Sequence, residues 1–194
     1  MPFTVLVVCT GNISRSPMTQ LLLEFWSDPK AGLVVSSAGT HALVGQPMDD
    51  GAASAMRELG IDPSRHRARQ FQPDMAAEAD LIITAEQTHL EVVLAQTPTA
   101  LRRAFTIKEF ARLVAHVDAA DPDSVVAQAA ALRGLVPRPA DAADDDVADP
   151  HRQPTAVSRS TAAELTVAVR AIVDALGVAA KPAGTRRRPL PYRR

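Results

Sequence analysis

Residues 3–17 read FTVLVVCTGNISRSP, and this stretch decides the fold. Residues 3–8 are apolar or β-branched at consecutive positions, which is typical of a strand buried on both faces of a parallel sheet. A short loop containing Gly11 follows, and Ser16 and Pro17 then open a helical pattern. Ser is a good helix N-cap and Pro is favoured at the first helical position, so the stretch predicts a strand, a loop and a helix in succession.

The same alternation continues along the chain. Short β-rich runs predict further strands, and apolar residues at helical spacing predict helices between them. Strands that alternate with helices predict an α/β fold, here a single domain with a small, mostly parallel sheet of about four strands and helices on both faces. The further predicted strands are residues 33–36, 79–84 and 104–107, and the further predicted helices run from Asp49 or Asp50 to Leu59, over residues 86–95 and over residues 161–176.

The composition is that of one ordinary globular domain with an extension. Of the 194 residues, 46% are apolar and 22% are charged, and we expect the domain to occupy residues 1–178. Residues 114–148 are rich in Ala, Asp and Pro, and we interpret them as an insertion with one short helix near residues 124–132. Residues 179–194 hold six basic residues and no acidic one, which predicts a disordered tail, either solvated or in contact with an acidic partner.

Several classes of protein are excluded by what the sequence lacks. No apolar run approaches the roughly 20 residues of a membrane span and no secretory signal opens the chain, so we expect a cytoplasmic protein. Residues 1–178 carry 15 basic and 22 acidic residues, a net charge of −7, which argues against nucleic-acid binding. The lone Cys9 allows no disulfide, and the five His residues form no metal-ligand spacing, so we expect neither a cofactor nor a metal.

The segment from Cys9 to Arg15 carries the chemistry. A thiol is a strong nucleophile only as a thiolate, which a helix N-terminus and a neighbouring cation stabilise. Five intervening residues are enough to curl the backbone around a tetrahedral anion, and the planar Arg15 fork can hold two of its oxygens. We expect Gly11 to adopt backbone angles that a Cβ would forbid and Asn12 to take a left-handed conformation, while Ser16 either caps the helix or donates to the Cys9 sulfur. The predicted phosphate-binding residues are Thr10, Gly11, Asn12, Ile13, Ser14 and Arg15.

Residues 9–17 resemble the signature of the low-molecular-weight protein-tyrosine phosphatases, Cys-x-Gly-Asn-x-x-Arg-Ser-Pro. Further segments are similar to later blocks of that family, and Asp149-Pro150 stands where the family places its general acid. The resemblance covers most of residues 3–178. The similar blocks are residues 37–40, 45–49, 60–62, 66–70, 79–83 and 105–110.

The resemblance implies a phosphatase that acts on tyrosine-phosphorylated proteins in two steps and needs no metal. Cys9 would attack phosphorus while Arg15 and the loop amides stabilise the charge on its oxygens. Asp149 would protonate the leaving oxygen and then accept a proton from water, with Asp146 as the next candidate for this acid.

The resemblance also assigns residues that support the loop. Asn12, Ser37 and His66 would hold it in shape from behind, together with Ser16. The Arg-rich surroundings of His66 by themselves favour an exposed side chain, so its position tests the resemblance.

The sequence departs from the family pattern around the substrate. Ser14 replaces the second Cys that most members carry, so no disulfide can protect the nucleophile from oxidation. Leu43, His151 and Arg152 stand where aromatic residues are common, and Arg152 would attract an acidic phosphopeptide. Ile13 is apolar where the related arginine phosphatases carry Thr, which favours phosphotyrosine over phosphoarginine.

Three other functions remain open on the same loop. The first is a protein-arginine phosphatase, which would hydrolyse phosphoarginine instead of phosphotyrosine. An arsenate reductase would need an external low-molecular-weight thiol, because the chain has no further Cys for an internal disulfide relay. A phosphate-binding regulator would need neither a nucleophile nor an acid, so the joint presence of Cys9, Arg15 and Asp149 argues against it.

Overall fold

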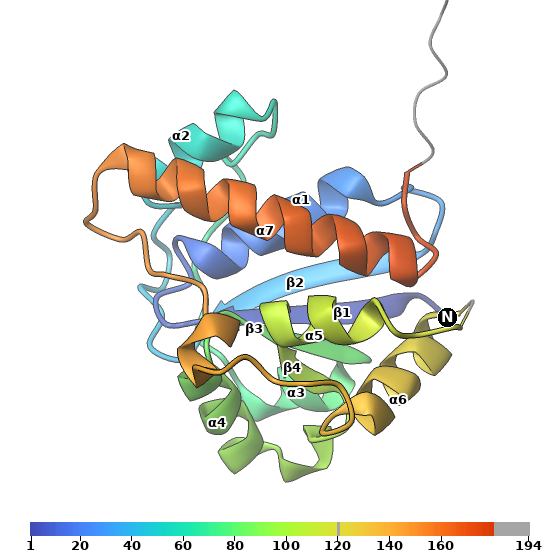
Figure 1. The fold of residues 1–194 in the computed structure, drawn as a ribbon. Coiled ribbons are helices and arrows are strands. Elements are labelled where there is room, and N and C mark those ends of the chain that lie inside the picture. The colour runs from blue at the N-terminus through green and yellow to red at the C-terminus, as the bar shows by residue number, and fades with distance from the viewer. Residues whose placement is uncertain (120, 181–194) are drawn as a thin grey trace, which may run out of the picture.

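Four parallel strands form the centre of the molecule (Figure 1). The computed structural model describes residues 1–119 and 121–180. The predicted α/β fold with a small parallel sheet is confirmed, since every pairing between neighbouring strands is parallel. The strands β1 (Phe3–Cys9), β2 (Leu33–Gly39), β3 (Leu81–Thr84) and β4 (Ala104–Thr106) lie in the order β2-β1-β3-β4.

Helices cover both faces of this sheet. They are α1 (Arg15–Trp26), α2 (Asp50–Glu58), α3 (Pro73–Glu78), α4 (Gln87–Gln96), α5 (Ile107–Val114), α6 (Pro122–Leu132) and α7 (Thr155–Ala175), with 3₁₀ turns at Pro98–Ala100 and Ala142–Asp145. Alternate residues of β1 enter opposite cores. Val5 and Val7 pack with α1, α2, α5, α6 and α7, whereas Leu6 and Val8 pack with α3 and α4. Burial on both faces explains the continuous apolar run that opens the chain.

The ends of several elements differ from the prediction. α1 begins at Arg15, two residues before Pro17, the predicted first helical residue, and the side chain of Ser16 turns toward Cys9 instead of capping the helix. α7 begins at Thr155, well before the predicted residue 161. The prediction missed α3 and α5, and β4 ends at Thr106 because its hydroxyl accepts the N–H of Glu109 and caps α5.

The region predicted to be an insertion contributes to the core. Its predicted short helix is present as α6, and the α6 residues Val125, Val126 and Ala129 are buried in the same cluster as Val5. Val147 is fully buried. Of the predicted basic tail, residues 181–194 lie outside the described residues. Within the part that is described, no helix is long and apolar enough to cross a membrane.

The carboxyl ends of the strands meet at one edge of the sheet. β1 ends at Cys9, and its two neighbours in the sheet, β2 and β3, end beside it at Gly39 and Thr84. In open parallel sheets, ligands bind outside the carboxyl ends of the strands, at the place where the strand order reverses. β2 and β3 lie on opposite sides of β1, so this reversal falls at the loop after β1.

Gly39 allows that loop to pass close to β2. A Cβ at this position would collide with the carbonyl oxygen of Thr10 and lie 3.0 Å from the backbone nitrogen of Asn12. Gly11, in contrast, lacks a positive φ, and a Cβ there would meet only Ile13 Cγ1 at 3.5 Å. The expectation that Gly11 needs angles forbidden to other residues is therefore wrong, and the close approach at Gly39 is what requires a glycine.

We expect Gly39→Ala to lower the free energy of unfolding by about 1–3 kcal/mol, because the new methyl group overpacks against backbone that cannot move aside. Gly11→Ala is the matched control and should lower the free energy of unfolding by less. Urea unfolding of the two variants measures the difference. An equal loss in both would show that the loop does not depend on its contact with β2.

Candidate active site

The loop that follows β1 curls in front of the N-terminus of α1. Cys9 is 2% exposed, and its Sγ lies 2.9 Å from the Oγ of Ser16. Asn12 Nδ2 donates to the same Ser16 oxygen at 2.9 Å, which leaves the hydroxyl hydrogen of Ser16 available for the sulfur of a Cys9 thiolate. A donated hydrogen bond and a helix N-terminus both stabilise a thiolate. The geometry therefore equips Cys9 to act as a nucleophile.

Asn12 anchors the loop from behind. Its φ of 54° is left-handed, as predicted. Its side chain donates to Ser37 Oγ at 2.9 Å and accepts the backbone N–H of Arg69 at 2.9 Å. His66 Nε2 lies 2.6 Å from the carbonyl oxygen of Asn12, so the half-buried His66 donates to the loop. The structure thus brings Ser37 and His66 into direct contact with Asn12 of this loop.

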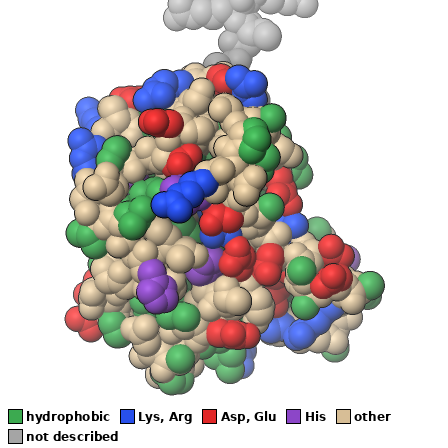
Figure 2. Space-filling model, turned by 90° about the vertical axis from the view of Figure 1, so that its left-hand side faces the viewer, with side chains coloured by type: hydrophobic (Ala, Val, Ile, Leu, Met, Phe, Trp, Pro, Cys, Tyr) green, Lys and Arg blue, Asp and Glu red, His purple; other side chains and the backbone are tan. Residues whose placement is uncertain are grey.

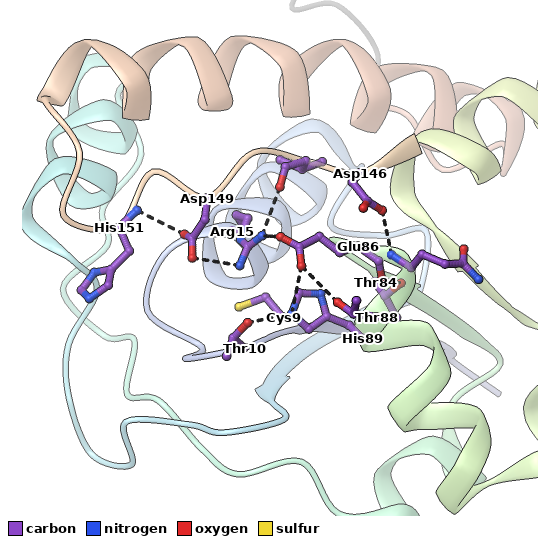
Figure 3. Close-up of polar contacts among 12 residues, drawn as sticks. Cys9, Thr10, Arg15, Thr84, Glu86, Thr88, His89, Asp146, Asp149 and His151 are labelled. Carbon is purple, nitrogen blue, oxygen red and sulfur yellow. Dashed lines mark hydrogen bonds and ion pairs between the residues drawn. The ribbon is translucent and has the colours of Figure 1, made fainter. Parts of the chain in front are cut away.

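Arg15 closes the loop with a buried guanidinium that is 3% exposed. Its Nη1 bonds to the carboxylate of Glu86 and to the carbonyl oxygen of Val147, the latter at 3.1 Å. Its Nη2 lies 3.1 Å from Asp149 Oδ2 (Figure 3). The fork is therefore held by Glu86 on one side, and its other nitrogen faces the carboxylate of Asp149.

Two residues of this site were missed by sequence reasoning, Glu86 and His89. Glu86 follows β3, so the rule that parallel strands end at a common edge could have pointed to it. His89 is buried in α4, and its Nε2 lies 2.8 Å from Thr10 Oγ1 in the loop. Burial lowers the pKa of His89, the nearby charge of Arg15 lowers it further, and Glu86 opposes the shift.

The structure separates the two candidate acids. Asp149 points to Arg15, and its half-exposed carboxylate also accepts the N–H of His151 at 3.1 Å. Asp146 Oδ1 instead accepts the backbone N–H of Gln87 at 2.7 Å and so faces α4 (Figure 3). Of the two, only Asp149 stands over the loop that ends in Arg15.

Cys9, Arg15 and Asp149 line a pocket of about 300 Å³ at the carboxyl edge of the sheet. Figure 2 views this edge and shows His and basic side chains between an apolar group on one side and a row of acidic side chains on the other. Within residues 1–119 and 121–180, no cluster of His, Cys, Asp and Glu could hold a metal ion. The pocket is lined by Cys9, Thr10, Gly11, Ile13, Ser14, Arg15, His41, Leu43, Asp149, His151 and Arg152.

Comparisons with known proteins show that the chain is similar to phosphatases. A family model described as low molecular weight phosphotyrosine protein phosphatase matches residues 4–136. The probable low molecular weight protein-tyrosine-phosphatase EpsP of Ralstonia nicotianae is 39% identical over 119 residues, which cover 61% of this chain and 77% of EpsP. The protein-arginine-phosphatase of Geobacillus stearothermophilus is 34% identical over 110 residues, which cover 57% of this chain and 72% of that protein.

Solved structures match over a longer part of the chain. The YwlE arginine phosphatase from Geobacillus stearothermophilus has a TM-score of 0.69 at 27% identity, and the match covers 90% of this chain and 93% of that one. The low molecular weight protein tyrosine phosphatase from T. tengcongensis has a TM-score of 0.67 at 28% identity, with 89% and 98% covered. The fold therefore matches phosphatases with two different named substrates.

His66 makes the stability of the loop depend on pH. Burial lowers its pKa, and Arg67 and Arg69 act in the same direction, while the hydrogen bond to Asn12 opposes them. The folded protein therefore binds this proton less tightly than the unfolded chain does. Its contribution to stability is complete above the ordinary imidazole pKa of about 6.5 and is lost as the pH falls through the lower folded-state pKa.

We expect His66→Gln, which keeps a donor near the Nε2 position, to reduce the loss of stability between pH 7.5 and pH 5 without abolishing it, because the pKa of His89 is shifted in the same direction. Urea unfolding at the two pH values measures this slope for the wild type and the variant. An unchanged slope in His66→Gln would contradict the assignment.

Proposed function

This chain belongs to the low molecular weight phosphotyrosine protein phosphatase family, and we propose that it hydrolyses phosphotyrosine in proteins through a phosphocysteine intermediate. The observation that carries this proposal is the convergence of Cys9, Arg15 and Asp149 on one pocket. They supply a nucleophile, an anion-binding fork and a proton donor, the three groups that hydrolysis of a phosphate monoester by this route requires.

In the first step the thiolate of Cys9 attacks phosphorus in line with the leaving oxygen. The S–P bond forms as the P–O bond to the phenol breaks, and the loop amides and Arg15 stabilise the charge on the other three oxygens. The protonated carboxyl of Asp149 gives its proton to the leaving oxygen. Asp149 Oδ2 lies 3.1 Å from Arg15 Nη2, so an incoming phosphoryl group displaces this carboxyl from the guanidinium.

The second step returns the enzyme to its starting state. Asp149, now a carboxylate, accepts a proton from the water that attacks phosphorus. The S–P bond breaks, inorganic phosphate leaves, and the hydrogen bond from Ser16 stabilises the regenerated thiolate of Cys9. Asp149 gives one proton to the phenol oxygen in the first step and takes one from water in the second, so the cycle restores its own protonation state.

The pocket wall supports an aryl substrate. Ile13 and Leu43 present apolar side chains to the pocket, and Leu43 remains 47% exposed, which suits contact with a ring. Protein-arginine phosphatase is the second candidate, because the chain is similar to proteins of that name. A phosphoarginine guanidinium would gain little from Ile13, which is why we favour phosphotyrosine.

Arg152 and the thiol of Cys9 support two further parts of the proposal, the sequence preferred beside the phosphotyrosine and the cell compartment. Arg152 lines the pocket and favours an acidic residue beside the phosphotyrosine. The free thiol of Cys9 suits a reducing compartment, so we propose a cytoplasmic enzyme acting on phosphorylated proteins. Arsenate reduction would need an external thiol, and a regulator that only binds phosphate would need neither Cys9 nor Asp149.

We expect Asp149→Ala to lower kcat/KM for phenyl phosphate, whose phenol is a poor leaving group, by about 10²–10³-fold. The loss should be much smaller for p-nitrophenyl phosphate, whose leaving group needs less help from an acid. Asp146→Ala is the matched control and should change kcat/KM for either substrate little, since the Asp146 carboxylate faces α4. Steady-state kinetics on the two substrates decide between the acids. If Asp146→Ala shows the leaving-group effect instead, the general acid is misassigned.

The choice of substrate is tested by comparing kcat/KM for a phosphotyrosine peptide, a phosphoarginine peptide and arsenate with added thiol. We expect the phosphotyrosine peptide to exceed the others by at least about tenfold, a difference near 1.4 kcal/mol in transition-state binding. Cys9→Ser should abolish turnover while still binding inorganic phosphate. Preference for phosphoarginine would replace the proposed substrate, and turnover by Cys9→Ser would refute the covalent mechanism.

A further inference from the structure

We propose that His151 is a positioning residue, which holds the segment carrying Asp149 in place through a hydrogen bond between its ring and the carboxylate of Asp49. His151 Nδ1 lies 3.0 Å from Asp49 Oδ2, and both side chains are partly buried. The two residues are 102 positions apart, so the pair ties the segment before α7 to the start of α2. This inference rests on the proposed function, because it gives His151 a part in delivering the general acid.

Asp49 is a fixed point of the structure. Its backbone N–H donates to the carbonyl oxygen of Ile13 at 2.8 Å, which joins it directly to the phosphate-binding loop. Its Oδ1 accepts the N–H of Gly51 at 3.1 Å and caps α2. Its second oxygen, Oδ2, is the one that meets His151. A residue that contacts Asp49 is therefore tied, through this one backbone hydrogen bond, to the phosphate-binding loop.

His151 connects Asp49 to the general acid, Asp149. Its backbone N–H donates to Asp149 Oδ1 at 3.1 Å, while its ring reaches in the other direction to Asp49. Figure 3 shows the ring turned away from Cys9 and Arg15. His151 thus contacts the carboxyl of Asp149 through its backbone. Through its ring it contacts Asp49, which in turn bonds to the phosphate-binding loop.

The segment needs such an attachment. Gln153 donates to the carbonyl oxygen of Pro150 in a turn, and Arg152 within that turn has a φ of 60°. A left-handed conformation is unfavourable for a residue other than glycine and persists only where neighbouring contacts impose it. The pair between His151 and Asp49 supplies a contact immediately before Arg152.

The pair also survives the step in which Asp149 acts. In the proposed reaction the phosphoryl group takes the place of Asp149 on Arg15, so the ion pair between these two residues is lost as the acid becomes active. The contact of His151 with Asp49 does not involve Arg15. It therefore keeps Asp149 within reach of the leaving oxygen when Asp149 no longer touches the guanidinium.

Three variants separate this role from general damage. His151→Leu removes the ring donor, whereas His151→Asn keeps a donor near the Nδ1 position and should retain most of the activity. Asp49→Ser keeps a side chain that caps α2 but is too short to reach His151. We expect His151→Leu and Asp49→Ser to lower kcat/KM for phenyl phosphate by about tenfold and for p-nitrophenyl phosphate by less than about twofold, because misplacing a general acid removes part of its contribution.

The double variant and two binding measurements complete the test. His151→Leu with Asp49→Ser should lose no more than either single variant, since both remove the same pair. The inhibition constant of inorganic phosphate should stay within about twofold, and amide hydrogen exchange over residues 148–154 should speed up by about tenfold in both single variants but not in His151→Asn.

The outcomes are distinct from those of the proposed function. Equal losses on both substrates, additive losses in the double variant, weaker phosphate binding, or a His151→Asn variant as slow as His151→Leu would each overturn the proposal. If the wild type hydrolyses neither aryl phosphate, the proposed function fails. Hydrogen exchange then still decides whether the pair holds the segment, and an unchanged exchange rate would refute it.

Discussion

Arg15 carries a full positive charge in a side chain that is 3% exposed, and a buried charge is tolerated only when it is paired and hydrogen-bonded. Its partners come from distant parts of the chain. Glu86 lies 71 positions away and Val147 lies 132 positions away, and Asp149 completes the set. Pairing this one guanidinium therefore brings the end of β3 and the segment before α7 up against the loop after β1.

The partners of Arg15 divide into lasting and exchangeable ones. Glu86 also accepts a hydrogen bond from the hydroxyl of Thr88 at 3.1 Å, so in the proposed cycle it can keep Arg15 oriented throughout. Asp149 is half-exposed and stands at the mouth of the pocket. In the proposed cycle a phosphoryl group replaces Asp149 on Arg15, and this exchange converts a structural ion pair into a free general acid.

Much of this site could be predicted from the sequence, because its central part is continuous. The spacing of Cys9 and Arg15 and the left-handed Asn12 are properties of one short loop between a strand and a helix. Gly11 and Gly39 show the limit of such reasoning. Gly11 looked conformationally required from its neighbours in the chain, whereas the glycine that is required lies at the end of the adjacent strand.

The sequence by itself determined the α/β alternation and the loop from Cys9 to Arg15, since these depend on periodicity and on residues within a few positions of one another. Only the tertiary structure decided which acid faces Arg15, that Glu86 and His89 support the loop, and that His151 meets Asp49. These contacts join segments 71 to 134 positions apart. Their existence follows from the order of the strands and the packing of helices around them, which no local pattern of residues records.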